Sequence, residues 1–235
     1  MRTVAVMQPY IFPYIGYFQM VAAVDKFIFY DDVNFIKQGW INRNKILVSN
    51  SEFVFTVPLK KASSFNLIKD TEINPDLYMK WKPKFLQTLD QSYKKAPFFR
   101  EAYSVIEEIL NKECTEISSL AIHSVKELAV YLQLDTEFAV SSEAYENKGL
   151  ERQERLLDIC KTENASHYIN AVGGQELYNK EDFQHAGVTL NFIKTLPIEY
   201  QQFKNEFVPW LSIIDVMMFN SKEDIRSLLL KYQLL

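Results

Sequence analysis

The stretch from residue 3 to residue 44 limits the possible folds of this chain more than any other. It starts with the short apolar run Thr3 to Met7, breaks at Gln8-Pro9, and continues through an aromatic loop into a helix-like segment, Tyr14 to Val24. A second apolar run, Phe27 to Tyr30, ends at Asp31-Asp32. Short unbroken apolar runs are typical of strands buried in a parallel sheet, and parallel neighbours need a crossover between them. The stretch therefore predicts a right-handed βαβ unit whose strand ends form a ligand-binding edge.

The rest of the chain continues this alternation around a helical middle. Residues 52–57, 67–73, 137–140, 167–170 and 188–193 have the composition of strands, and residues 150–160, 209–219 and 222–232 have helical spacing. Between them, residues 75–135 are predicted to be helical, and residues 31–50 to form a long polar loop. We therefore expect one α/β domain over residues 1–235 with a mainly parallel, Rossmann-like sheet. Residues 75–135 would be a helical insertion or a flanking layer.

Composition excludes several classes of protein. The net charge is −4 and no basic run is present, so broad nucleic-acid binding is not expected. Residues 4–24 carry no charge, but Gln8, Pro9 and Pro13 interrupt them, which argues against a signal peptide or a transmembrane segment. Cys114 and Cys160 lie far apart and are expected to be apolar thiols in a reducing compartment. The prediction is a cytoplasmic protein.

No common cofactor or metal motif occurs in the sequence. The six glycines form neither a P-loop nor a GxGxxG fingerprint, and the three histidines lie in no HExxH motif. We therefore predict no metal site. A Ser/His/Asp triad remains open, although no GxSxG motif supports one.

The candidate site residues cluster in the first 44 positions. Asp31 and Asp32 follow a strand, where a carboxylate could act as a base or hold an amine or sugar hydroxyl groups. Asn42-Arg43-Asn44 supplies several donors and a planar guanidinium for phosphate or carboxylate. Alternatively, Arg43 is the ion partner of Asp31 or Asp32 and holds the loop closed.

Three further residues of this stretch are candidates for lining the pocket. Gln8 could offer its amide to a ligand, and Tyr10 could stack on one or donate a hydrogen bond. Gly16 would let an anion approach the backbone N–H groups at the start of a helix. The alternative for the loop is that its tyrosines cover the core, and for Gly16 that it permits a tight helix–strand contact.

These residues belong to a set that resembles the WbqC-like family of bacterial proteins. The matching pieces are Gln8 to Phe18, Asp31-Asp32-Val33, Asn42 to Ile46, Tyr93 to Pro97, Ser141-Ser142, Tyr200-Gln201, Leu211 to Asp215 and Phe219-Asn220. The chain departs from the pattern at Asn34, at Lys84, where a histidine is expected, and in the turn Ala171 to Gly174. Members of this family occur in gene clusters for O-antigen and other surface polysaccharides, and a glycine-transferase role has been suggested for some.

The resemblance implies a transferase of surface-polysaccharide (O-antigen-type) biosynthesis. It would transfer an amino-acyl (glycyl-like) or related group to a nucleotide-linked or lipid-linked amino sugar, using ATP or another activated acyl donor. Asp32 and Arg43 are the predicted catalytic residues. The predicted substrate-binding residues are Gln8, Tyr10, Gly16, Asp31, Asn42, Asn44, Ser142 and Gln201.

Two other functions stay open at this stage. The strand–loop–helix–strand order is similar to that of HxGH-type nucleotidyltransferases, with Tyr14 to Tyr17 at the place of the HxGH loop but without its two histidines. An ATP-using nucleotidyltransferase or ligase is therefore one alternative. A non-catalytic scaffold is the other, in which exposed tyrosines and Phe12 would form a flat apolar patch.

Overall fold

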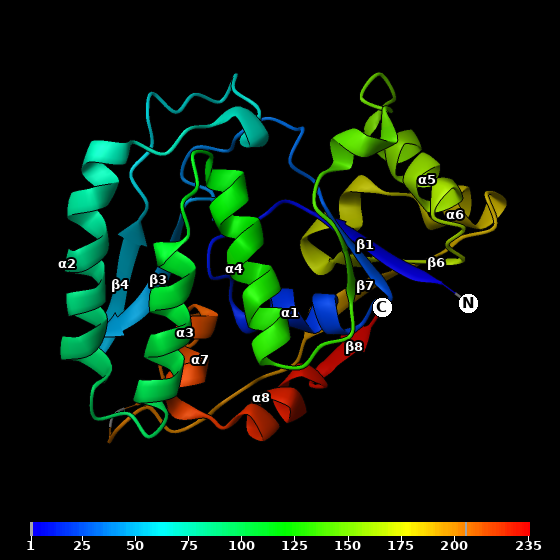
Figure 1. Cartoon of the computed structure of the whole chain (residues 1–235). Helices are drawn as coiled ribbons and strands as arrows, with labels where there is room; N and C mark the ends of the chain where they lie inside the picture. Colours follow the sequence, from blue (N-terminus) through cyan, green and yellow to red (C-terminus); the bar gives the residue numbers. More distant parts are fainter. Residues whose placement is uncertain (1, 205) are drawn as a thin grey trace.

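The computed structural model describes residues 2–204 and 206–235, and its main sheet has six strands (Figure 1). The strand order is β5-β2-β1-β6-β7-β8. Its members are β1 (Thr3–Met7), β2 (Lys26–Phe29), β5 (Glu137–Ala139), β6 (His167–Ala171), β7 (Thr189–Thr195) and β8 (Tyr232–Leu234). All pairs are parallel except β7 with β8. The predicted α/β class and mainly parallel sheet are confirmed.

Side chains alternate along each strand, so they point to both faces of the sheet. Helices cover each face, and both faces are therefore buried. Ala5, Phe27 and Ile169 point into one core cluster, which α1 (Ile15–Ala22), α7 (Ile213–Phe219) and α8 (Lys222–Leu229) help to cover. Val4, Ile28 and Tyr168 point into the second cluster, beneath α5 (Arg152–Thr162) and α6 (Lys180–His185). This double cover explains why the central strands are continuous apolar runs.

The strand order reverses between β1 and β6. From β1 the chain proceeds through α1 to β2, and β5 lies beyond β2, whereas β6, β7 and β8 lie on the other side of β1. In open α/β sheets, ligand sites form outside the carboxyl ends of strands at such a reversal. The loop after β1 starts at Gln8, so the predicted ligand-binding edge lies at this part of the sheet.

A separate hairpin occupies the last part of the long loop predicted for residues 31–50, so the loop is confirmed only up to residue 42. β3 (Arg43–Val48) pairs antiparallel with β4 (Ser51–Thr56), which was predicted. Ser49 and Asn50 join them with φ values of 49° and 65°. A two-residue turn with both φ values positive is the type I′ geometry that suits the twist of a hairpin.

The helical middle is confirmed and lies beside the hairpin (Figure 1). It consists of α2 (Pro75–Tyr93), α3 (Phe99–Asn111) and α4 (Ile117–Tyr131). The Asn74 side chain accepts a hydrogen bond from the Leu77 backbone and so caps α2 at its start. Buried side chains of all three helices belong to the same core cluster as Ala5 and Phe27. The limits of this segment as an insertion or a flanking layer stay a prediction.

One predicted element was wrong, and one predicted helix ends earlier than expected. Residues 67–73 form a short 3-10 helix, η1 (Ile68–Asp70), because their backbone bonds go to the loop after β2: Ile68 N–H to Val33 and Lys69 N–H to Asp31. The last predicted helix stops at Leu229, and the chain then forms β8 on the edge of the sheet. In the described part of the chain, no helix combines the length and apolarity that crossing a membrane requires.

Candidate functional site

Asp31 lies in a buried polar cluster at the carboxyl ends of β2 and β5. One of its carboxylate oxygens accepts hydrogen bonds from the Ser141 hydroxyl group at 2.7 Å and from the Ser142 backbone N–H at 3.2 Å. Burial raises the pKa of Asp31, and the hydrogen bonds from Ser141 and Ser142 partly offset that rise. The carboxylate therefore ties the end of β5 to the end of β2.

Asp32 forms a buried ion pair with Arg155 of α5. The Asp32 side chain is 3% exposed and that of Arg155 is 5% exposed. Asp32 also accepts a hydrogen bond from the Ser142 hydroxyl group. The Arg155 guanidinium stacks over the Tyr30 ring at 4.7 Å and donates from Nε to the Asn147 side chain at 2.8 Å. Neither charge is left unpartnered, so this pair fastens α5 to the carboxyl edge of the sheet.

Arg43 does not contact either aspartate. Its guanidinium donates to the carbonyl oxygens of Gly39, at 3.2 Å, and Gln38, and it lies 5.4 Å from the centre of the Trp40 ring. The alternative in which Arg43 pairs with Asp31 or Asp32 was therefore wrong, because Arg155 takes the place beside Asp32. Arg43 instead shapes the turn that presents Trp40.

Asn42 and Asn44 use their amide groups within the protein. Asn42 donates to the carbonyl oxygen of Val57 at 2.9 Å. Asn44 donates to the carbonyl oxygens of Ile11, at 3.2 Å, and Phe12, at 2.9 Å. Asn44 thus joins the hairpin to the aromatic loop, by which we mean residues 8–14.

The aromatic loop is mostly packed, with Tyr10 and Tyr14 half-buried at its surface. Burial raises the pKa of both hydroxyl groups, so both rings stay neutral at physiological pH. The Gln8 carbonyl oxygen accepts a hydrogen bond from Tyr17 at 2.9 Å. Phe12 is fully buried, which removes it from the apolar patch that a scaffold would need.

Gly16 permits a close approach of α1 to β7 and to Tyr14. A Cβ atom at this position would lie 2.3 Å from the Tyr14 ring and 2.6 Å from Thr195 Oγ1. Side chains of the protein therefore occupy the space that an anion would need, and the geometry is that of the tight helix–strand contact.

Gln201 is exposed and donates to the Phe203 carbonyl oxygen at 3.0 Å. Its neighbour Gln202 is buried and donates to the Asp215 carboxylate at 2.6 Å. Asp215 also accepts hydrogen bonds from Tyr93 at 2.9 Å and from Tyr200 at 2.7 Å. This network holds the segment before α7 against α2, and sequence reasoning did not anticipate it.

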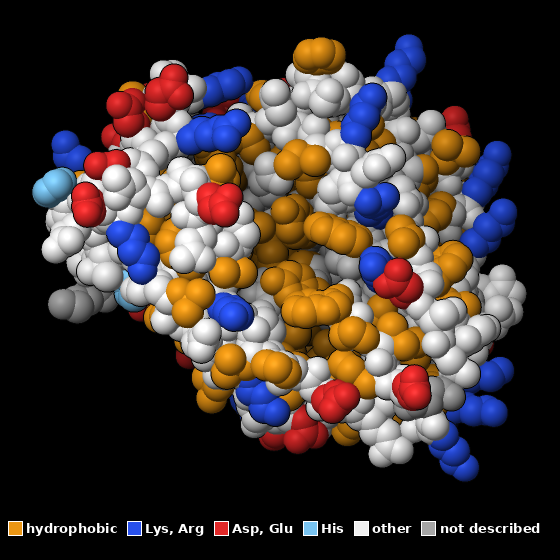
Figure 2. Space-filling view, turned by 180° about the vertical axis from the view of Figure 1, so that it is seen from behind, with side chains coloured by type: hydrophobic (Ala, Val, Ile, Leu, Met, Phe, Trp, Pro, Cys, Tyr) orange, Lys and Arg blue, Asp and Glu red, His pale blue; other side chains and the backbone are white. Residues whose placement is uncertain are grey.

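Two adjoining hollows lie beside the aromatic loop. The large hollow has a volume of about 1050 Å³ and lies between the end of β7, the start of β8 and the segment leading to α7. The small hollow has a volume of about 260 Å³ and is lined by Tyr10, Pro13, Tyr14, Trp40, Asn44 and Trp210. Tyr14 and Trp210 line both hollows, and their ring centres are 6.1 Å apart. Figure 2 shows a face of the molecule that is hollowed and lined mainly by hydrophobic side chains.

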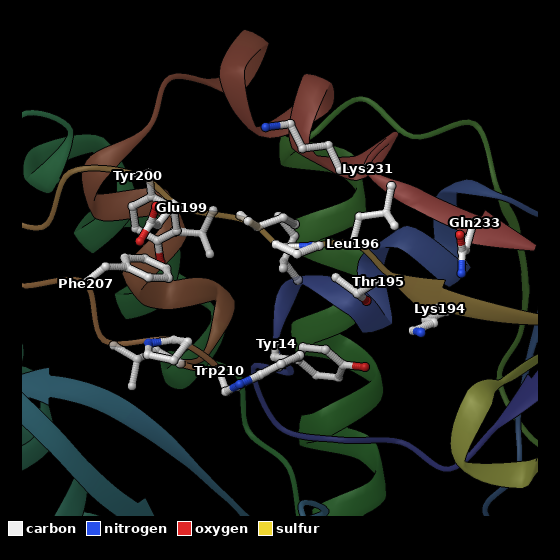
Figure 3. A pocket seen from close by; sticks show the side chains of 16 residues that line it. Tyr14, Lys194, Thr195, Leu196, Glu199, Tyr200, Phe207, Trp210, Lys231 and Gln233 are labelled. Atoms are coloured by element: carbon white, nitrogen blue, oxygen red, sulfur yellow. The ribbon is translucent and has the colours of Figure 1, made fainter.

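The large hollow combines aromatic walls with a few charged groups. Figure 3 shows Glu199, Tyr200 and Phe207 on one side and Lys194 and Gln233 on the other. Trp210 is 67% exposed and has a φ of 61°, in the left-handed region that few residues of its size adopt. Backbone strain of this kind is typical of sites where a side chain must be presented in one direction.

Of the predicted site residues, the hollows bring together only Tyr10 and Asn44. Asp31, Asp32 and Ser142 form the buried cluster at β2 and β5, while Gln201 and Gly16 line neither hollow. Their roles in catalysis and binding stay predictions. Sequence reasoning missed Trp210 and Arg155. A tryptophan directly after Pro209, between an apolar run and a helical segment, was the available signal for the first.

No group of three or more His, Cys, Asp or Glu side chains that could hold a metal ion occurs in the described parts of the chain.

A family model matches nearly the whole chain, from residue 8 to residue 227, and its description is the WbqC-like protein family. The chain belongs to the WbqC-like family. The match includes the aromatic loop, the hairpin and the segment carrying Trp210, so it covers the whole lining of the small hollow and all of the large hollow's lining except Lys231 and Gln233.

A relative in Mycobacterium tuberculosis, described as an uncharacterized protein, is 28% identical to this WbqC-like chain over 223 residues. The alignment covers 94% of each chain. No solved structure matches the chain significantly.

Proposed function

We propose that this WbqC-like protein is a transferase of bacterial surface-polysaccharide biosynthesis that binds an amino sugar against the aromatic walls of the two hollows. The sugar would be nucleotide-linked or lipid-linked. The transferred group would be an amino-acyl (glycyl-like) or related group, taken from an activated donor such as one formed with ATP. Family membership supports the pathway, and the paired hollows support the binding.

The observation that carries this proposal is the pair of adjoining hollows beside the aromatic loop, which share Tyr14 and Trp210. Ligand sites are typically concave, mainly apolar, and furnished with a few polar groups. Here, Trp40 and Trp210 contribute indole rings to the lining, and Tyr10 and Tyr14 contribute aromatic rings with hydroxyl groups. The small hollow is below the usual size of a complete ligand pocket, so it suits one ring of a larger substrate.

The chemistry needs a group that can take a proton from the sugar amine. In the acyl transfer, the amine nitrogen bonds to the acyl carbon, the bond from that carbon to its carrier breaks, and the nitrogen loses one proton. Glu199 is the one carboxylate among the side chains described as lining the hollows. We assign it this role, because Asp32 is committed to Arg155 inside the protein.

The test uses a strain that makes the polysaccharide and carries Trp210→Ala or Glu199→Gln. We expect the amino-sugar substituent of the polymer to be lost or strongly reduced in mass spectra, while protein levels stay normal. Glu113→Gln is the matched control, because Glu113 is also exposed but lies on a distant turn after α3. An unchanged polymer with both variants would contradict the proposal.

The ATP-using alternative receives less support from the geometry. The glycine that would admit phosphates beside α1 is enclosed by Tyr14 and Thr195.

A further inference from the structure

Two neighbouring loops at one end of the molecule carry exposed apolar side chains. The loop between β2 and β3 and the loop between β4 and η1 are joined by a hydrogen bond from the Phe35 N–H to the Asn66 carbonyl oxygen at 2.8 Å (Figure 1). The next residue outward on each loop is apolar, Ile36 on the first and Phe65 on the second. Ile36 is 52% exposed, and Phe65, at 91%, is more exposed than any other large hydrophobic side chain that the structure describes.

The paired loops, by which we mean residues 35–40 and 60–66, are anchored to the rest of the protein. The Phe35 side chain is buried in the core cluster that also holds Ala5. The Arg43 guanidinium donates to the carbonyl oxygens of residues 38 and 39 and so holds the turn of the first loop. The exposed apolar side chains are therefore presented from a defined backbone, which lowers the entropy cost of binding a partner.

The charge of the paired loops is positive. They contain Lys37, Lys60 and Lys61 and no acidic residue, although the whole chain has a net charge of −4. Lys60 pairs with Glu72 at 2.7 Å. Lys37 and Lys61 are exposed, and neither ammonium group forms an ion pair with any residue that the structure describes.

This combination of side chains fits the headgroup region of a bilayer better than it fits a protein. Protein–protein interfaces are depleted in lysine, because desolvating its ammonium group is costly. At an anionic membrane surface, each lysine is attracted to the lipid phosphates, and its long apolar stem lets the charge stay in water. Exposed aromatic and aliphatic side chains between such lysines can enter the boundary between headgroups and acyl chains.

We propose that the paired loops dock onto the anionic surface of a lipid bilayer. Ile36 and Phe65 insert among the headgroups, and Lys37 and Lys61 lie against lipid phosphates. Trp40, which lines the small hollow, follows Ile36 by four residues, so at most about 14 Å of chain separates them, and docking brings the small hollow close to the membrane. The inference goes beyond the proposed function, and within that function it favours the lipid-linked form of the amino sugar over the nucleotide-linked form.

Sedimentation of the full chain with sucrose-loaded vesicles tests this directly. Vesicles of equal parts phosphatidylglycerol and phosphatidylcholine should bind the wild type more strongly than pure phosphatidylcholine does, and salt should weaken the binding. Phe65→Ser should lower the partition coefficient by about tenfold or more, and Ile36→Ser should lower it by a smaller factor. Leu230→Ser is the matched control, because Leu230 is 75% exposed but follows α8, at the opposite end of the molecule (Figure 1).

The lysines have their own variants. Lys37→Gln and Lys61→Gln should each lower the partition coefficient on the anionic vesicles by about fivefold and leave binding to pure phosphatidylcholine unchanged. Lys95→Gln should change neither value, because Lys95 is an exposed lysine in the turn between α2 and α3, at the end of α2 that lies away from the paired loops (Figure 1).

Three results would overturn the inference. Absence of the chain from the anionic vesicle pellet would refute docking, and the proposed transferase would still stand if Trp210→Ala removes the polymer substituent. Vesicle binding that neither Phe65→Ser nor Ile36→Ser weakens would mean that another surface meets the bilayer. A dimer that Phe65→Ser dissociates in analytical ultracentrifugation, without vesicle binding, would mean that a second copy of the chain covers the paired loops.

Discussion

Asp32 illustrates how the role of one residue depends on a partner far away in the sequence. A carboxylate directly after a buried strand is a sound candidate for a site, and the sequence does place it at the carboxyl edge. Its partner, Arg155, lies on α5, 123 residues later, and helical spacing gives no sign that this arginine turns inward. Sequence reasoning therefore found the place of Asp32 in the fold but could not assign its contacts.

Removing Arg155 should leave the Asp32 charge buried and uncompensated. We expect Arg155→Met to lower the free energy of unfolding by about 3–5 kcal/mol in urea titrations. Asp32→Asn combined with Arg155→Met should cost less than the two single changes added together, because the residues interact directly. Arg152→Met is the control, since Arg152 lies on the same helix but is exposed. Little loss of stability in Arg155→Met would show that the pair is not structural.

Asp215 should give the stability a specific dependence on pH. Burial raises its pKa although three side chains donate hydrogen bonds to it. Because the folded-state pKa lies above the unfolded value of about 3.9, the folded protein holds this proton more tightly, and the contribution to stability is lost as pH rises through the folded-state pKa. The unfolding free energy of the wild type minus that of Asp215→Asn should therefore fall as pH rises from about 4. A difference that grows with pH would contradict this.

At the scale of elements, the sequence predicts the sheet better than it predicts the hairpin. Strands such as β1 and β2 are short apolar runs bounded by polar residues, so their burial on both faces can be read directly. β3 begins with Arg43-Asn44-Lys45, which are weak strand formers, and its turn is Ser49-Asn50 rather than a more typical Asn-Gly. The hairpin forms because Asn44 and Ile46 pack beneath the aromatic loop, a tertiary contact that local propensity does not reveal.

The contact between α1 and β7 depends on the absence of a side chain at Gly16. Gly16→Ala should displace Tyr14 or strain the helix, at a cost of about 1–3 kcal/mol in unfolding free energy. Gly149→Ala is the control, because nothing lies within 4 Å of a Cβ atom there and its stability should be unchanged or slightly higher. Equal stabilities of the two variants would argue against a close helix–strand contact.

At the scale of the whole molecule, the two hollows connect parts of the chain that are far apart in the sequence. The aromatic loop after β1, the turn before β3 and the segment before α7 each contribute one or more aromatic side chains to the small hollow. Only the first two of these were candidates from sequence, because the position of Trp210 depends on the path of the chain between β7 and α7. The three tryptophans of the chain then divide into two groups: Trp40 and Trp210 line the small hollow, whereas Trp81 stacks on Phe85 in α2 at 4.9 Å.

That division makes fluorine NMR of the protein labelled with fluorotryptophan the most direct test of sugar binding at the hollows. Substitution of each tryptophan by phenylalanine assigns the three resonances. On titration with an amino sugar linked to an alkyl phosphate or to a nucleotide, the resonances of Trp40 and Trp210 should shift together while that of Trp81 stays in place. No shift at millimolar ligand, or a shift confined to Trp81, would contradict the proposed site.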